Sequence, residues 1–110
     1  MNSDEFQKNS LKSVALSSDD PHALAHRALG ITGEAGILAN RIKKIIRDKN
    51  GTADKEDLQA IERLLGDVLY YSAVLADYFG MSLSEVMQNN INRSSQFAKD
   101  RKNLDEVFKK

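Results

Sequence analysis

The chain has 110 residues, of which 41% are hydrophobic and one is proline, and this predicts a single compact helical domain spanning residues 1–110. Its formal net charge is zero, and its Lys and Arg residues are spread along the chain, so we expect no nucleic-acid partner. The absence of cysteine excludes disulfides, thiolate metal sites and a cysteine nucleophile.

The segment Met1–Lys12 is polar rather than a hydrophobic leader, and no apolar run reaches the length of a membrane span. We therefore expect a cytoplasmic protein with no membrane partner. Residues 2–14 carry only a sparse apolar stripe of Phe6, Leu11 and Val14. This pattern predicts a first helix that is docked on a larger body.

Capping and stop signals divide the rest of the chain into three longer helices. Three helix starts are marked by side chains that can accept from the free N–H groups of a first turn. They are Asp20 followed by Pro21, then Thr52 or Asp54, and then Ser82 with Glu85 in a capping box. Stop signals are Gly51, after a helix that ends near Asp48, and Gly80, after one that ends at Phe79. Residues 98–110 are predicted to form a loose tail or an extra short helix. The three returns of the chain predict an all-α, antiparallel four-helix bundle.

Helical periodicity predicts which residues face the core. The buried stripe of the second helix is predicted to contain Leu38, Ile42, Ile45 and Ile46, with Glu34, Ile37, Arg41 and Lys44 at its edge. The buried stripe of the third is predicted to contain Ile61, Leu65, Val68, Ser72, Leu75 and Phe79, with Leu64, Asp67 and Tyr70 nearer its edge. In the fourth helix Asn90 falls within the inward stripe, as a structural hydrogen-bonding group or as a ligand contact.

Glu34 and Asp67 each follow a glycine and border a predicted core face. A carboxylate in that position needs a cation, a hydrogen-bond donor or water. The simple interpretation is a solvated acid on an amphipathic helix. Glycines inside helices are costly, so Gly30, Gly33, Gly36 and Gly66 favour close helix approach or ligand access instead. Two such glycine–acid dipeptides on separate helices, Gly33-Glu34 and Gly66-Asp67, predict a shared site.

The order of motifs resembles the MazG-like nucleotide pyrophosphohydrolases over nearly the whole chain. The matching stretches are Gly33-Glu34-Ala35-Gly36, Leu65-Gly66-Asp67-Val68-Leu69-Tyr70-Tyr71, Ser82-Leu83 and Asn90-Ile91. The resemblance implies an all-α homodimer or homotetramer that hydrolyses a nucleoside triphosphate to the monophosphate and pyrophosphate. It also implies Mg²⁺ held by Glu-x-x-Glu on one helix and Glu-x-x-Asp on the next.

Only half of that acidic set is present. Glu34 matches the first acid and Asp67 the last, and these are the candidate catalytic and metal-binding residues. Ile37 and Leu64 stand where the other two acids would be. The resemblance implies substrate contacts at Lys44, Tyr70, Asn90 and Arg93, while Phe97 stands where a phosphate-contacting Arg is common.

Two interpretations follow from this incomplete set. In the first, the chain is an enzyme with impaired turnover, in which Glu34 and Asp67 hold one Mg²⁺ weakly together with the substrate phosphates. In the second, it is a non-catalytic or redesigned helical relative that acts as a nucleotide-binding or oligomeric interaction module. Ile37 and Leu64 then fill the space that a metal would take.

Overall fold

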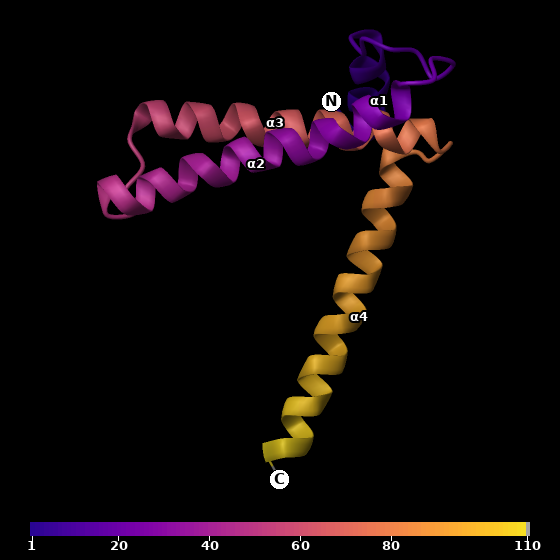
Figure 1. The fold of residues 1–110 in the computed structure, drawn as a ribbon. Helices are drawn as coiled ribbons and strands as arrows, with labels where there is room; N and C mark the ends of the chain where they lie inside the picture. The colour runs from indigo at the N-terminus through magenta and orange to yellow at the C-terminus, as the bar shows by residue number, and fades with distance from the viewer. Residues whose placement is uncertain (110) are drawn as a thin grey trace.

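The computed structural model describes residues 1–109, which form four α-helices (Figure 1). They are α1 (Ser3–Lys12), α2 (Ala23–Lys49), α3 (Lys55–Tyr78) and α4 (Leu83–Lys109). No strand occurs among these described residues, so the predicted all-α class is confirmed. Residues 98–109 continue α4 without a break instead of forming a loose tail or a separate short helix, and Lys110 lies outside the described residues. None of the described helices has the length and hydropathy needed to cross a membrane.

Local signals end α2, start α3 and end α3 as the sequence predicts. Asp54 caps α3 by accepting from the Asp57 N–H at 2.8 Å, and the Asp57 carboxylate accepts from the Asp54 N–H at 3.0 Å. Gly51 and Gly80 follow α2 and α3 with φ of 79° and 72°. Glycine adopts this left-handed region without the steric cost that a Cβ would add.

The start of α2 differs from the prediction by two residues. The helix begins at Ala23, whereas Pro21 lies in the preceding turn. The cause is Asp20, whose carboxylate accepts from the His22 N–H at 2.7 Å and so stabilises a turn before the helix. Such a shift is within the ordinary scatter of helix boundaries.

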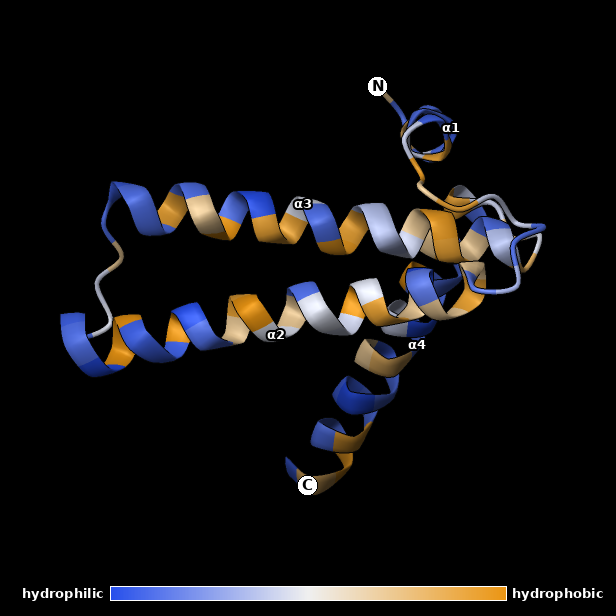
Figure 2. Ribbon diagram, turned by 45° about the horizontal axis from the view of Figure 1, so that its top comes forward, coloured by the Kyte–Doolittle hydropathy of each residue, from blue (hydrophilic) through white to orange (hydrophobic). Residues whose placement is uncertain are grey.

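α2 and α3 lie side by side as an antiparallel hairpin that forms the body of the molecule (Figures 1 and 2). The prediction of which line of α3 faces inward is wrong, since Leu64 is 1% exposed and Leu65 is 50% exposed. Successive residues of a helix are rotated by about 100° around its axis. The observed inward face of α3 therefore differs from the predicted one by a rotation of about one residue. Other residues predicted to be inward but exposed in the single chain are Ile42, Ile46 and Phe79. Apolar residues occupy more than one face of α3, and only contact with α2 selects the inward one.

One glycine allows a close approach of the two helices, and three others do not. A Cβ added to Gly30 on α2 would overlap the ring of Tyr71 on α3. Added to Gly33, Gly36 or Gly66, it would meet nothing within 4 Å. The expectation of close helix approach therefore holds at Gly30. At the other three positions the space beside the backbone is open.

A buried glutamine fixes α1 and the start of α4 to the hairpin. Gln7 on α1 is 8% exposed. Its amide Nε2 donates to the carbonyl oxygens of Ala73 and Met81, each at 3.0 Å, and its Oε1 accepts from the Leu83 N–H at 3.0 Å. One side chain therefore pairs backbone groups from the end of α3, the following turn and the first residue of α4.

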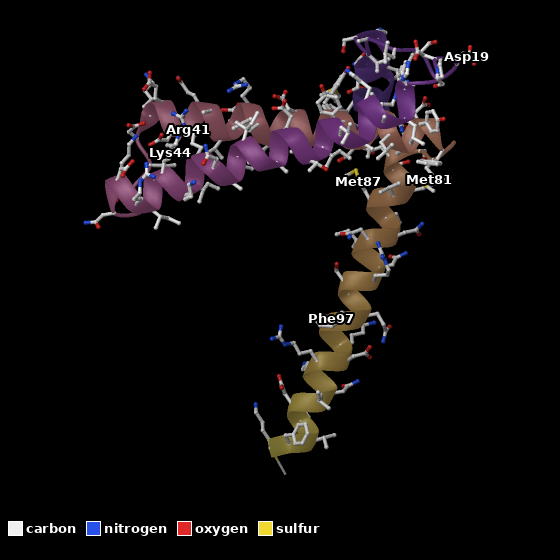
Figure 3. All side chains as sticks on the ribbon, in the orientation of Figure 1. Asp19, Arg41, Lys44, Met81, Met87 and Phe97 are labelled. Carbon is white, nitrogen blue, oxygen red and sulfur yellow. The ribbon has the colours of Figure 1, made fainter. Side chains whose placement is uncertain are left out.

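α4 leaves the hairpin after its first turn and projects away from it (Figures 1 and 3). Leu83 is buried, but every described residue from Glu85 onward is exposed. Exposed apolar side chains along α4 include Val86, Met87, Ile91, Phe97, Leu104, Val107 and Phe108. The prediction of an inward-facing Asn90 is wrong for the single chain, because no other helix among residues 1–109 covers that part of α4.

Candidate functional site

Two contacts fix the register of the α2–α3 hairpin. The backbone of Gly30 lies against the Tyr71 ring. Arg27, 1% exposed, donates from Nη1 to the Val74 carbonyl oxygen at 2.7 Å. Moving three residues back along α2 therefore moves the partner three residues forward along α3, as antiparallel helices of equal rise require.

The same register places Glu34 and Asp67 at one level of the hairpin. Glu34 lies four residues after Gly30 on α2, and Asp67 lies four residues before Tyr71 on α3. Four residues are slightly more than one turn, so each acid also stays close to the line of its helix that faces the other. The two Gly-acid steps noted in the sequence therefore come from adjacent turns of two packed helices.

Both acids are partly exposed, and neither is neutralised by a close partner. Glu34 makes no side-chain hydrogen bond or ion pair to any residue that the structure describes. Asp67 lies 4.0 Å from the guanidinium of Arg63 on its own helix, an exposed pair of little energetic weight. Within residues 1–109 no group of three or more Asp, Glu, His or Cys side chains is placed to hold a metal ion.

Ile37 and Leu64, which stand where the MazG-like pattern would have acids, lie in different environments. Ile37 is 54% exposed at the edge of α2, whereas Leu64 is 1% exposed and packs inside the hairpin. Mg²⁺ takes about six oxygen ligands in a nearly octahedral array. The residues of one chain supply two carboxylates at this level of the hairpin, so they do not fit a complete protein-held magnesium site.

The predicted substrate contacts separate into two groups. Lys44 lies on α2 toward the α2–α3 loop (Figure 3), and Tyr70 is partly buried on α3, where its ring packs edge-to-face on Tyr71 with centroids 5.1 Å apart. Asn90 and Arg93 are exposed on the part of α4 that projects from the opposite end of the hairpin. A single chain therefore does not bring Asn90 and Arg93 to Lys44.

A cleft of about 350 Å³ opens between α2 and the start of α3. Its lining residues are Ile37, Asn40, Arg41, Lys44, Ile45, Asp48, Lys49 and Asp57. Of the predicted site residues it contains Lys44 but neither Glu34 nor Asp67. Three cations and two carboxylates line it, so its wall carries an excess of positive charge.

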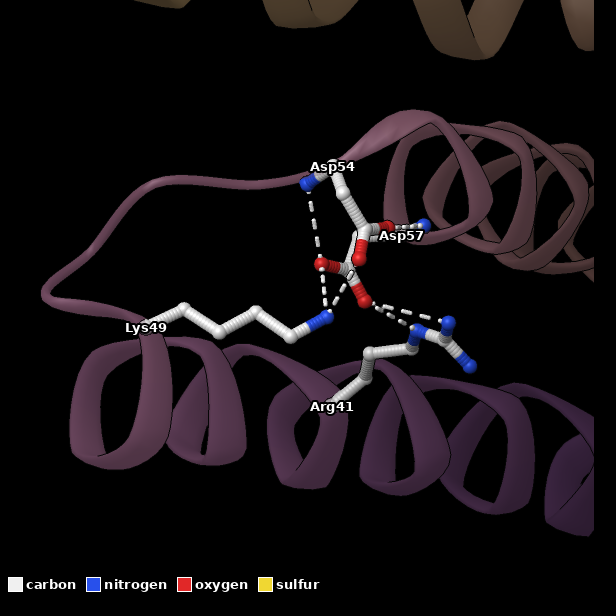
Figure 4. Close-up of polar contacts among 4 residues, drawn as sticks. All are labelled: Arg41, Lys49, Asp54 and Asp57. Carbon is white, nitrogen blue, oxygen red and sulfur yellow. Dashed lines mark hydrogen bonds and ion pairs between the residues drawn. The ribbon is translucent and has the colours of Figure 1, made fainter.

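A buried carboxylate organises one end of this cleft (Figure 4). The side chain of Asp57 is 4% exposed, and both of its oxygens are occupied. Oδ1 accepts from Arg41 Nε at 3.2 Å and lies 3.1 Å from Arg41 Nη2, while Oδ2 accepts from Lys49 Nζ at 2.7 Å. Lys49 also donates to Asp54 Oδ2 at 2.7 Å. Asp57 thus holds two cations of α2 in fixed positions.

These contacts lower the pKa of Asp57 from its ordinary value of 3.8 to about 2. The largest cause is the hydrogen bond from Lys49, followed by the one from the Asp54 backbone N–H, and Arg41 adds a smaller effect in the same direction. The hydrogen bonds to Asp54 and Asp57 correspondingly raise the pKa of Lys49. The cluster is therefore fully ionised at neutral pH.

Sequence analysis did not identify Asp57, Lys49 or Asn40 as residues of a cleft. The available signal was the Asp54-x-x-Asp57 pattern after Gly51, which is a capping box with an acid at its third position. A capping box predicts a helix start and does not predict which residues of the preceding helix the second acid will contact. That contact depends on the hairpin register.

Comparison with known proteins finds a phage protein of similar sequence. The "Gene 37 protein" of Mycobacterium phage L5 is 42% identical over 83 residues, which cover 76% of this chain and 72% of that protein. No protein-family model matches the chain. No solved structure matches it. At this identity and coverage, the chain belongs to the family of the phage L5 Gene 37 protein.

Proposed function

We propose that this chain is a MazG-like nucleoside triphosphate pyrophosphohydrolase with impaired turnover, which releases pyrophosphate and a nucleoside monophosphate. The observation that carries the proposal is the shared level of Glu34 and Asp67 on two packed antiparallel helices, each acid partly exposed and without a strong partner. A partly exposed carboxylate with no strong protein partner is available to bind a cation or to act as a base.

Slow turnover follows from the incomplete acidic set. Phosphoryl transfer depends on positioning and on balancing the charge of the phosphate oxygens. With Ile37 and Leu64 in place of two acids, the chain contributes two carboxylates, and any bound Mg²⁺ would take its other ligands from water and from the substrate. We therefore expect weak Mg²⁺ binding by the chain alone.

Pyrophosphate release from a panel of NTPs and dNTPs, with Mg²⁺ and with Mn²⁺, tests the proposal. We expect slow release from at least one nucleotide, which is slower still in Glu34→Gln and in Asp67→Asn. Glu62→Gln is the matched control, because Glu62 is an exposed acid on α3 with no ion pair to any described residue. Release that persists unchanged in both site variants would show that the acids are not part of an active site.

The alternative is a non-catalytic, nucleotide-binding or associative module. The observation that favours it is Leu64, which fills interior space of the hairpin where the family pattern has an acid. This alternative predicts no pyrophosphate release with any metal, and its nucleotide-binding form also predicts a rise in melting temperature when nucleotide is added. The enzyme hypothesis predicts both nucleotide binding and pyrophosphate release.

We also propose that the chain forms a homodimer or homotetramer. Ile42 and Ile46 lie about 200° around α2 from Lys44, on the opposite face of the helix. They are 41% and 64% exposed. Leu58, Leu65 and Leu69 on α3 are at least half exposed, and so is much of the apolar stripe of α4. Exposed apolar surface of this extent indicates a protein partner. In such an oligomer α4 can bring Asn90 and Arg93 to the acid pair of a second copy.

A further inference from the structure

The apolar residues of α4 follow a seven-residue repeat. With Leu83 and Met87 as positions d and a of a heptad, the apolar side chains of α4 fall only at positions a, d, e and g. Positions b, c and f contain only charged, amide or hydroxyl side chains from Glu85 to Lys109. The helix has 27 residues, and a pattern sustained over more than three heptads is typical of a coiled coil. The sequence of α4 therefore favours pairing with another helix along its whole length.

We propose that α4 pairs with α4 of a second copy as an antiparallel coiled coil, in the register that sets Ser94 opposite the partner's Phe97. A twofold axis relates the two helices, so one self-complementary surface serves both copies. The pairing rests on the proposed homo-oligomer, for which it names the surface and the register, and it is independent of hydrolysis. In it Asn90 and Arg93 contact α4 of the partner and not its acid pair.

The core positions of the two helices match in this register. The opposed core residues are Met87 with the partner's Leu104, Asn90 with the partner's Arg101, and Ser94 with the partner's Phe97. The large Phe97 ring meets a small serine, and the Arg101 guanidinium can donate to the amide oxygen of Asn90. Met87, Phe97 and Leu104 are each more than half exposed in the single chain. The pairing therefore removes apolar surface from water without leaving a charge unpaired.

The positions that flank this core match as well. In the antiparallel arrangement position g lies beside g of the partner, and e lies beside e. The opposed flanking residues are Val86 with the partner's Val107, Arg93 with the partner's Asp100, and Ile91 with the partner's Ala98. Flanking residues of this kind set the choice and orientation of the partner helix. The Arg93–Asp100 pair occurs twice, once on each side of the twofold axis.

A parallel pair of the same helices is opposed by charge. In register, it would set Arg101 against the partner's Arg101 in the core and Asp100 beside the partner's Asp105 at the flank. Like charges in these positions disfavour pairing. The antiparallel arrangement contains neither contact, so charge selects it.

An apolar cavity at the base of α4 gives independent support for this register. The cavity has a volume of about 230 Å³, and its lining includes Phe6 of α1, Leu69 of α3, and Leu83 and Met87 of α4. The register sets the partner's Phe108 opposite Leu83, at this cavity. Phe108 is 79% exposed in the single chain, on a part of α4 that stands clear of the hairpin (Figure 3). The last apolar residue of each α4 thus has an apolar cavity on the other copy.

Sedimentation equilibrium of the full chain, without nucleotide or metal, tests the surface. Phe97→Glu places a charge in the core of the pair and should weaken association by roughly ten-fold or more. Ser95→Glu is the matched control, because it adds the same charge at an outer position of the same helix, and it should associate as the parent does. Both residues are exposed in the single chain, so neither change disturbs its fold. A monomeric parent would overturn the pairing together with the proposed homo-oligomer, whereas an oligomer that Phe97→Glu leaves unchanged would overturn the pairing alone.

Charge reversal tests the register in the same assay. Arg93→Asp and Asp100→Arg each turn two attractive pairs into repulsive ones, so each should weaken association by roughly two- to thirty-fold. The double variant restores opposite charges with their order exchanged, and it should associate within about two-fold of the parent. Losses that add in the double variant would contradict this register.

Introduced thiols distinguish antiparallel from parallel pairing. The chain has no cysteine, so a mixture of Met87→Cys and Leu104→Cys chains, oxidised together in glutathione buffer, should form a mixed disulfide dimer. Either variant oxidised alone should not, because its two thiols lie about 25 Å apart along the paired helices. Disulfide formation by one variant alone as readily as by the mixture would overturn the antiparallel arrangement.

Discussion

Introducing acids where the proposed MazG-like pattern would have them, by Ile37→Glu and Leu64→Glu, should have very different costs at the two positions. Ile37 is 54% exposed and Leu64 is 1% exposed. The pair would recreate a four-acid arrangement on the facing helices. Because the two side chains differ in burial, the destabilisation caused by each change measures how buried that position is.

The expected destabilisation follows from the burial. Removing a fully buried leucine side chain forfeits about 1.5–3 kcal/mol of transfer free energy, and an unpaired buried charge adds roughly 3–5 kcal/mol unless the carboxyl protonates. Leu64→Glu should therefore lower the free energy of unfolding by about 4 kcal/mol or more, a large part of the roughly 5–15 kcal/mol of a typical domain. Ile37→Glu should cost about 1 kcal/mol or less, because about half of the side chain is already in water.

Urea unfolding followed by circular dichroism measures both costs, and a magnesium titration of the melting temperature then tests the site. The double variant should melt lower than the parent in chelator and recover as Mg²⁺ rises, since a ligand of the folded state stabilises it by mass action. The melting temperature of the parent should respond little to Mg²⁺.

If Leu64→Glu costs no more than Ile37→Glu, the inward placement of Leu64 is refuted. Equal magnesium responses in parent and double variant would show that positions 37 and 64 do not face a metal site. A magnesium response gained without turnover would place the defect in the substrate contacts. Phe97, which stands where the family pattern commonly has a phosphate-contacting Arg, would then be the first position to test.

Three further predictions concern contacts that hold the helices together. Gly30→Ala should destabilise by about 1–3 kcal/mol through overlap with a ring, whereas Gly33→Ala should stabilise by about 0.5–1 kcal/mol because its surroundings are open; thermal melts of the two variants compare them. The folded-state pKa of Asp57 lies below its ordinary value, so its contribution to stability is present above about pH 4 and is lost as pH falls toward 2. Asp57→Asn should flatten that part of a stability profile measured by urea unfolding. Gln7→Leu leaves three backbone groups without their partner and should cost about 1–3 kcal/mol in the same assay.

The helix boundaries could be predicted from the sequence because their causes are local. Asp54 caps a helix by bonding to a backbone group three residues away, and Asn50, Gly51 and Gly80 adopt left-handed conformations that most residues with a side chain avoid. These interactions need no information from distant parts of the chain. The all-α class follows from them together with helical periodicity.

The inward faces could not be predicted in the same way. Leu64 and Leu65 are equally apolar neighbours, and contact with α2 alone makes the first buried and the second half exposed. Asn90 fits an apolar stripe that no other described helix of the single chain covers. The cation cluster around Asp57 depends on which residues of α2 lie opposite the start of α3, and this register is a tertiary property.

A double-mutant cycle on pyrophosphate release tests the central claim, that Glu34 and Asp67 act as one site, most directly. Rates are compared for the parent, Glu34→Gln, Asp67→Asn and the double variant with the best nucleotide in Mg²⁺. Groups that act as a unit are non-additive, so we predict that the double variant is about as slow as either single variant. Single variants that release pyrophosphate as fast as the parent, or effects that multiply fully in the double variant, would contradict a shared site.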